Sequence, residues 1–285
     1  MNSENKVVLV TGGGHGLGKE IARAFLAAGF RVSICGRNQS RLDECRKELE
    51  TIAGPDAVCV TQADVSDQDD VRRLVSSTLE KFGQIDVLVN NAAVLGPLGS
   101  VESLDLKNWL KTIEINLCGT VLMSKEVIPH FKSRKQGRII NLSGGGATIG
   151  RPNFSAYAAS KAAVVRFTET LAQELADHGI TVNVVAPGAL NTEMLDNTLA
   201  AGVDVVGDKA FKQCSEQKQT GGDPLEPPCQ LCIFLTSDNA SKITGRLISA
   251  KWDNWHALAQ HADELVDTDI YTLRRITPQD RGLVW

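Results

Sequence analysis

Residues 6–30 read KVVLVTGGGHGLGKEIARAFLAAGF, a short apolar run, a glycine-rich loop and an amphipathic segment. The run Lys6–Thr11 is typical of a strand buried on both faces, and the segment after the loop has apolar residues at helical spacing. A strand, a glycine loop and a helix in this order predict a phosphate-binding turn. Gly12 allows the tight turn, Gly16 lets the backbone approach a pyrophosphate, and Gly18 lets the helix pack on the strand. The N-terminus of the helix then offers free N–H groups to the anion.

The rest of the chain repeats this alternation. Further strands are expected at 30–35, 57–62, 85–94, 137–143, 181–188 and 243–249, and further helices at 68–82, 107–132, 155–178 and 227–237. The pattern predicts an α/β fold, a Rossmann-type doubly wound parallel sheet in a single domain with a C-terminal extension. We place the nucleotide-binding domain at 1–250 and the extension at 251–285. Within the domain, 189–225 lacks clear periodicity and is interpreted as a mobile lid over the substrate site.

Composition narrows the class of protein. At 285 residues with 42% hydrophobic content, the chain can bury a full core. A formal net charge of −4 gives no electrostatic footprint for nucleic acid or an anionic membrane, so neither is expected as a partner. The sequence contains no run typical of a signal peptide or a membrane span, which predicts a soluble, cytoplasmic protein.

The seven cysteines are an odd number and suggest reduced thiols. Cys229 and Cys232 form a C-x-x-C, which could be redox-active or half of a metal site. Apolar residues at helical spacing around them instead favour a position facing a core. No metal site is expected.

The end of the second strand bears on the choice of nucleotide. An NAD site usually has Asp or Glu there to hold the ribose 2′-hydroxyl. This chain has Gly36 followed by Arg37. A guanidinium suits a 2′-phosphate because its planar fork of donors matches phosphate oxygens. The alternative is a solvated arginine that opens the next helix.

Polar residues also follow the next two strands. Asp64 and Val65 come after the third strand, and Asp64 could accept from an adenine amino group or serve as a carboxylate at a helix start. The strand at 85–94 carries Asn90, Asn91 and Ala92. Ligands bind beyond the carboxyl ends of strands in open α/β sheets, so these residues are expected beside a cofactor.

The stretch 141–161, NLSGGGATIGRPNFSAYAASK, holds a candidate catalytic pair. Tyr157 and Lys161 are four residues apart and project from one helical face. A phenol with an ordinary pKa near ~10 is a poor proton donor or acceptor at neutral pH, and a neighbouring ammonium lowers that pKa. The lysine could also grip the hydroxyls of a sugar ring. The alternative is a core aromatic beside a solvated lysine.

Asn116 is a further polar residue within an apolar helical pattern and must find partners if buried.

Taken together, the chain resembles the short-chain dehydrogenase/reductase superfamily in its compact single-domain branch, over roughly its first 250 residues. The motifs that carry the resemblance stand in the family's order: Thr11-Gly12-x-x-x-Gly16-x-Gly18, Asp64, Asn90-Asn91-Ala92, Asn116, Tyr157-x-x-x-Lys161 and Pro187-Gly188-x-x-x-Thr192. The resemblance implies that Tyr157 exchanges a proton with the substrate oxygen. Lys161 would bind the nicotinamide ribose and lower the pKa of Tyr157, and Asn116 would hold a water that relays protons to Lys161.

The resemblance also implies a cofactor-binding set. The Pro187-Gly188 turn and Thr192 would hold the nicotinamide carboxamide. The full expected set is Gly12, Gly14, His15, Gly16, Leu17, Gly18, Arg37, Asp64, Val65, Asn91, Ala92, Tyr157, Lys161, Pro187, Gly188 and Thr192.

One position departs from the family pattern. The family usually has a serine thirteen residues before the tyrosine to orient the substrate carbonyl, and that position is Gly144 here. The nearest hydroxyl is Ser143, and Thr148 and Ser155 are poorer candidates by position. We therefore predict Ser143 as the fourth catalytic residue beside Asn116, Tyr157 and Lys161, with a simple strand-end cap as the alternative.

The C-terminal extension is the second departure. It carries the aromatic and cationic residues Trp252, Trp255, Tyr271, Arg274 and Arg275. Such residues suit either the binding of a large polar anion or a subunit interface. The extension is therefore expected to lie over the substrate site or between subunits.

These observations predict an NADP(H)-dependent oxidoreductase that interconverts a carbonyl and a secondary alcohol by hydride transfer. Its substrate would be a small carbonyl or alcohol compound, anionic or nucleotide-linked, and the protein a homodimer or homotetramer. One alternative is an inactive cofactor-binding regulator, suggested by Gly144. The other is an epimerase or dehydratase acting on a nucleotide sugar.

Overall fold

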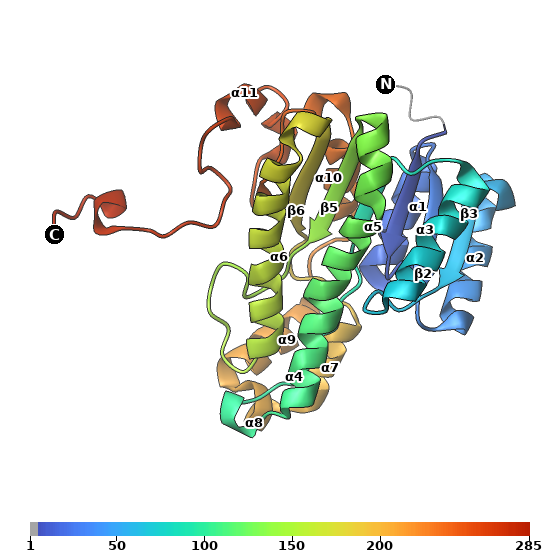
Figure 1. Ribbon diagram of the computed structural model, residues 1–285. Helices are drawn as coiled ribbons and strands as arrows, with labels where there is room; N and C mark the ends of the chain where they lie inside the picture. Colours follow the sequence, from blue (N-terminus) through green and yellow to red (C-terminus); the bar gives the residue numbers. More distant parts are fainter. Residues whose placement is uncertain (1–4) are drawn as a thin grey trace.

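The computed structural model describes residues 5–285 and contains one sheet of seven parallel strands (Figure 1). The spatial order is β3-β2-β1-β4-β5-β6-β7. The strands are β1 (Val7–Thr11), β2 (Arg31–Gly36), β3 (Val58–Gln62), β4 (Val87–Asn90), β5 (Gly137–Leu142), β6 (Ile180–Ala186) and β7 (Leu247–Ser249). The order reverses between β1 and β4, which is where ligands bind in sheets of this kind. The predicted fold class is confirmed.

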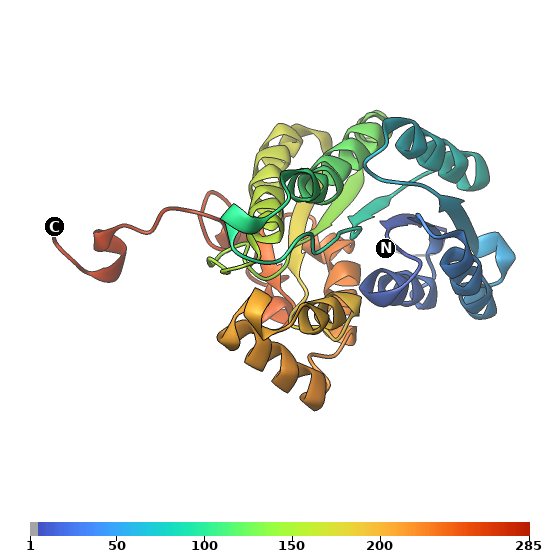
Figure 2. The same ribbon diagram turned by 90° about the horizontal axis from the view of Figure 1, so that it is seen from below.

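Helices cover both faces of the sheet, as Figure 2 shows from the carboxyl ends of the strands. One face packs against α1 (Gly16–Ala27), α2 (Gln39–Ala53) and α10 (Glu226–Leu235). The other packs against α3 (Gln68–Phe82), α5 (Gly119–Arg134) and α6 (Ser155–Glu174). The strands are buried on both sides, as expected from their continuous apolar runs.

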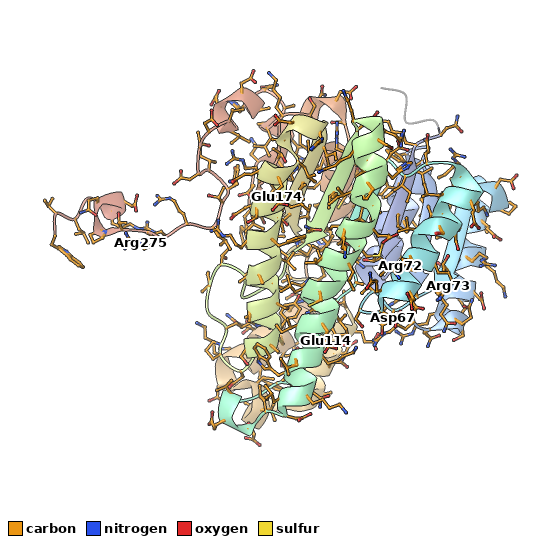
Figure 3. All side chains as sticks on the ribbon, viewed as in Figure 1. Asp67, Arg72, Arg73, Glu114, Glu174 and Arg275 are labelled. Carbon is orange, nitrogen blue, oxygen red and sulfur yellow. The ribbon has the colours of Figure 1, made fainter. Side chains whose placement is uncertain are left out.

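The start of α3 and the seven cysteines have defined local environments, and Cys229 and Cys232 face the core as predicted. Asp67 caps α3 by accepting from the backbone N–H groups of Asp69 and Asp70, at the helix end seen in Figure 3. Cys229 and Cys232 are buried in the core beneath α10, and all seven cysteines are free. Within the described part of the chain, no group of His, Cys, Asp and Glu is arranged to hold a metal. Among those same residues, no helix has the length and apolar character needed to cross a membrane.

The long helix expected at 107–132 is interrupted. It forms α4 (Leu106–Ile113), a π-helical turn at Glu114–Cys118 and then α5. Asn116 lies in this turn, and its side chain contacts Val94 in the loop that follows β4. Such turns inside α-helices are rare and concentrate at functional sites.

The lid at 189–225 is also more regular than its sequence suggests. It folds as three short helices, α7 (Glu193–Ala201), α8 (Val203–Val206) and α9 (Asp208–Thr220). Gly202 and Gly207, with φ of 82° and 83°, separate them. Because each glycine restarts the helical pattern on a new axis, no periodicity runs through the whole segment. The remaining short elements are α11 (Ala262–Leu265) and 3₁₀ turns at Pro55–Ala57, Val101–Ser103, Ala176–His178, Asp238–Ala240, Trp255–Ala257 and Pro278–Arg281.

The C-terminal extension divides into two parts. Trp255 and Leu265 belong to the main core, and the Arg246 guanidinium donates to backbone carbonyls of Leu265, Thr268 and Ile270. Residues up to 273 therefore pack on the domain. Residues 274–285, here called the arm, extend away from it (Figures 1 and 2).

Candidate active site

A cleft of about 1450 Å³ opens at the carboxyl ends of the strands. It is lined by the glycine loop after β1, the ends of β2 to β6, the lid and the first residues after β7. Every residue of the expected cofactor-binding set lines it, and so does Ser143. Asn116 lies beside the cleft without lining it.

The glycine loop is shaped by close backbone contacts. Gly12 and Gly16 have φ of 64° and 54°, a region that favours glycine. A Cβ on Gly18 would overlap the Gly12 carbonyl and the Asn91 amide, so α1 can start this close to β1 only with glycine there. The Asn91 side chain donates to the Thr11 carbonyl at 2.9 Å, and the Thr11 hydroxyl accepts from the backbone N–H groups of Asn91 and Ala92 at 3.0 Å each. The loop is thereby braced before any ligand arrives.

Two arginines stand at the nucleotide end of the cleft. Arg37 makes no ion pair with any residue of 5–285. Arg41 donates to Glu193 of the lid at 2.9 Å, and His15 of the glycine loop lies 3.6 Å from the same carboxylate. The lid therefore reaches across this end of the cleft, and Arg37 is left available for an anion.

Asp64 lies in the cleft just before α3, and its contact with an adenine amino group stays a prediction. It lines the cleft, and its carboxylate accepts from the Ser66 backbone N–H and hydroxyl at 2.9 and 2.6 Å. Burial raises the pKa of Asp64, but the hydrogen bonds from Ser66 and the nearby Arg37 outweigh burial and lower it. The carboxylate is therefore ionised and fixed near the start of α3.

Tyr157 and Lys161 lie one turn apart on α6 and are both buried. The Lys161 ammonium donates to the Leu142 carbonyl at 2.8 Å and lies 5.8 Å from the centre of the Tyr157 ring. Burial lowers the pKa of Lys161 to about 8. Burial also raises the pKa of Tyr157 to about 12, and the cation that opposes this rise is Arg151. The predicted lowering of the Tyr157 pKa by Lys161 is thus not found in the chain alone.

The structure explains the glycine at position 144. A Cβ on Gly144 would overlap the Tyr157 hydroxyl, so a serine cannot occupy this position without moving the tyrosine. The hydroxyl of Ser143 lies one residue earlier, is buried and has no hydrogen-bond partner among the described residues. A buried hydroxyl without a partner costs about 1–3 kcal/mol, so Ser143 is poised for an acceptor that enters the cleft. The strand-end cap that was the alternative role is not formed by this hydroxyl.

Asn116 braces the site from behind. Its side chain accepts from the Val94 backbone N–H at 2.8 Å and donates to the Val94 carbonyl and to the Ser160 hydroxyl at 2.9 and 3.0 Å. These contacts tie the loop after β4 to α6. The expected role in holding a water stays a prediction.

Sequence reasoning missed several residues of the cleft. Arg151 comes from the loop between β5 and α6, while Gln213 and Cys214 come from α9. Trp252 is 78% exposed, lines the cleft and borders a side hollow of about 240 Å³ next to Ser143. The spacing of these residues carries no signal, because the lid and the loop bring them together only in the fold.

The arginines of the extension lie elsewhere. Arg274 pairs with Asp269 and Asp280, and Arg275 lies on the arm, away from the domain (Figure 3). Neither lines the cleft, so within one chain they do not contribute to a substrate site.

Residues 6–201 match the short chain dehydrogenase family. The chain belongs to this family. Among curated relatives of this short-chain dehydrogenase, a 3-oxoacyl-[acyl-carrier-protein] reductase from Synechocystis is 40% identical over 192 residues, which is 67% of this chain and 77% of the relative. Levodione reductase from Leifsonia aquatica is 35% identical over 86% of this chain and 92% of its own. These relatives make the chain an oxidoreductase of this family.

Solved structures agree in fold and differ in cofactor. An actinorhodin polyketide ketoreductase variant with NADPH has a TM-score of 0.79 at 32% identity and covers 87% of this chain and 96% of its own. NAD⁺-bound xylitol dehydrogenase has a TM-score of 0.80 at 25% identity, over 87% and 98% of the two chains. Short-chain dehydrogenases thus bind both NAD⁺ and NADPH. The preference of this chain for one of them depends on its own residues at the end of β2.

Proposed function

We propose that this short-chain dehydrogenase interconverts a ketone and a secondary alcohol with NADP(H), and that Tyr157 exchanges the proton with the substrate oxygen. The observation that carries the proposal is the arrangement around Gly144. The Tyr157 hydroxyl lies against this glycine, and the unpartnered Ser143 hydroxyl comes from the adjacent residue. Both residues line the same cleft, and a carbonyl oxygen accepts two hydrogen bonds, so a ketone oxygen bound there could use both hydroxyls.

The residues at the other end of the cleft fit a dinucleotide. The open space beside Gly16 and the free N–H groups at the start of α1 suit a pyrophosphate. When bound, the nicotinamide supplies or takes up the hydride. Tyr157, whose pKa is about 12, keeps its proton at neutral pH and can donate it as the substrate oxygen gains charge. Ser143 would orient that oxygen, and Lys161 would grip the ribose.

The preference for NADP(H) rests on Arg37. Its guanidinium stands at the end of β2 with no ion-pair partner among residues 5–285, and the preceding position is Gly36 instead of an acidic residue. A 2′-phosphate would give this cation a partner, whereas a 2′-hydroxyl would not. Reduction of the ketone is then the favoured direction in a cell that keeps NADPH reduced.

We also propose a cytoplasmic homo-oligomer, a dimer or a tetramer. The arm is internally organised, because Arg274 is held by Asp280, which also caps the turn that starts at Thr277. Yet Ile276, Val284 and Trp285 on the arm are 58%, 97% and 83% exposed. An ordered apolar arm that leaves its own domain suits packing against a second copy. The free thiols are consistent with a reducing compartment.

The observation that suggested an inactive cofactor-binding regulator has another explanation. That alternative rested on the missing serine at position 144, and the contact between Gly144 and Tyr157 accounts for the glycine by packing alone. No observation favours the epimerase alternative, because the described residues form one sheet with no second domain for a sugar.

The test is to replace Tyr157 by phenylalanine and follow NADPH oxidation with a panel of ketones. Removing the proton donor should lower turnover by about 10²- to 10⁴-fold while the Kd for NADPH stays within twofold. The matched control is Tyr271→Phe, which changes the chain's other tyrosine outside the cleft. Retention of more than a tenth of the wild-type rate in Tyr157→Phe would overturn the assignment.

A further inference from the structure

Arg151 lies in the loop between β5 and α6, against the catalytic residues. Its guanidinium carbon lies 3.7 Å from the centre of the Phe154 ring. A Cβ on Gly145 would stand 3.3 Å from one of its terminal nitrogens, and a Cβ on Gly144 would meet the Tyr157 hydroxyl. The two groups therefore rest against consecutive residues, whose Cα atoms are about 3.8 Å apart. Both residues line the cleft.

The guanidinium of Arg151 has no anionic partner. Within residues 5–285 it makes no ion pair and no hydrogen bond, and the groups whose charge acts on it are Cys214 and Tyr157. The acidic residues that line the cleft are already engaged: Asp64 with Ser66, Glu193 with Arg41, Asp196 with Lys218 and Asp223 with Lys251. None of them is left to neutralise Arg151.

An unpaired cation in this position is costly and held in place. Burial lowers the pKa of Arg151, which shows that its charge is partly removed from water. Phe154, the ring beneath it, is fully buried, so the guanidinium rests on a fixed platform. A partly buried charge of this kind is normally paired. The missing partner is therefore expected from a ligand.

We propose that Arg151 binds an oxyanion group of the substrate, so that the substrates of this enzyme are ketones bearing a carboxylate or a phosphate a few bonds from the carbonyl. The inference rests on the proposed function and assigns its substrate class. The carbonyl oxygen meets Tyr157 and Ser143 while the anion takes the planar fork of Arg151. This places the anion site in the loop before α6 instead of at Arg274 and Arg275.

The experiment compares charged and neutral substrates of the same carbon skeleton. The pairs are acetoacetate with its methyl ester, levulinate with its methyl ester, and dihydroxyacetone phosphate with dihydroxyacetone. The readout is the ratio of kcat/KM for the charged over the neutral member. Any effect of Arg151 on Tyr157 is shared by both members and cancels in this ratio. The pair with the largest ratio identifies carboxylate or phosphate and the spacing from the carbonyl.

In Arg151→Gln the ratio should fall by about 10- to 100-fold, mainly through KM, as expected for loss of a charge-assisted bidentate contact. Arg151→Lys should keep part of the ratio, because it retains charge but not the fork. Arg275→Gln removes the same charge from the arm and should leave the ratio unchanged. A ratio that Arg151→Gln leaves within twofold of wild type would refute the proposal.

A binding measurement separates this proposal from the proposed function. Oxamate and inorganic phosphate are titrated into the NADPH-bound protein by calorimetry. Wild type should bind at least one of them, and Arg151→Gln should bind it at least tenfold more weakly. If this holds but no ketone is reduced, the anion site stands and the proposed function is wrong. If turnover is seen but neither anion binds and no pair shows a charge preference, the proposed function stands and the anion site is wrong.

Discussion

The two halves of the cleft are built in different ways. The nucleotide half consists mainly of backbone: the glycine loop, the ends of β1 to β4 and the Asn91 brace. The substrate half consists mainly of side chains from the loop before α6, the lid and Trp252. Arg37 in the first half and Arg151 in the second make no ion pair with any described residue. The halves can therefore be damaged separately, and the following variants test that separation.

The largest effect is expected from placing a serine where the family usually has one. Gly144→Ser puts a side chain into the Tyr157 hydroxyl, so the tyrosine must move. Because a misplacement of about 1 Å can cost 10²-fold, turnover should fall by about that factor or more. The Kd for NADPH should not change. Gly150→Ser, on the same loop with open space around it, is the control.

Ser143→Ala sharpens the result, because it removes the hydroxyl that we assign to substrate orientation. We expect a loss of about 10²-fold in kcat from the missing donor. If adding Gly144→Ser restored the activity of Ser143→Ala in the double variant, Tyr157 could move to accept a side chain at position 144 without loss of turnover.

The pH dependence should differ between the two directions of the reaction. Reduction needs Tyr157 protonated, and a pKa of about 12 keeps it so from pH 6 to 9. We therefore expect kcat/KM to stay level up to about pH 8 and to fall above it only as Lys161, with a pKa of about 8, loses its charge. Oxidation needs the phenolate, whose fraction rises tenfold per pH unit below the pKa. Its kcat/KM should therefore rise about 100-fold from pH 7 to 9. A plateau in oxidation below pH 8 would show that the bound cofactor lowers the Tyr157 pKa by several units.

Arg37→Ala should damage only the nucleotide half. Loss of a charge-assisted phosphate contact should weaken NADPH by about 1.5–3 kcal/mol and leave NADH almost unchanged, as measured by fluorescence titration. Arg72→Ala, on the outer surface of α3, is the control (Figure 3). Equal weakening of both cofactors would place 2′-phosphate recognition on other residues.

The smallest effect on catalysis is expected from removing the arm. A chain that ends at Leu273 loses no buried side chain, so its thermal midpoint should shift by less than about 4 °C. Turnover should persist and the mass by light scattering should fall. A cut after Ala250 is a different experiment, because it removes Trp255, Leu258 and Leu265 from the core at about 1.5–3 kcal/mol each. An unchanged mass would leave the arm without an interface role.

Every residue that the sequence predicted for the nucleotide half lines the cleft, and the contact of these residues with a cofactor stays a prediction. The residues of this half follow strand ends and glycine turns, whose positions depend on local patterns such as KVVLVTGGGHGLG. The substrate half was less accessible. Ser143 could be proposed by counting back from Tyr157, but the reason for Gly144 is a contact between residues thirteen positions apart. The sequence around Arg151 does not indicate a binding role. Its lack of an ionic partner becomes visible only in the fold, where each acidic residue of the cleft pairs with another group.

Two of the attachments between the lid and the domain differ in strength. Near α8, Val206 packs in a buried apolar cluster with Phe154 and Tyr157, whereas the other end of the lid meets α2 and the glycine loop through Glu193 alone as an ion pair. The partners of that pair are about half exposed, and such pairs are worth about 0–1 kcal/mol. The lid is therefore held more firmly by its apolar contacts near α8 than by the ion pair at Glu193. Salt screens exposed ion pairs of this kind, so raising the ionic strength should loosen this end of the lid.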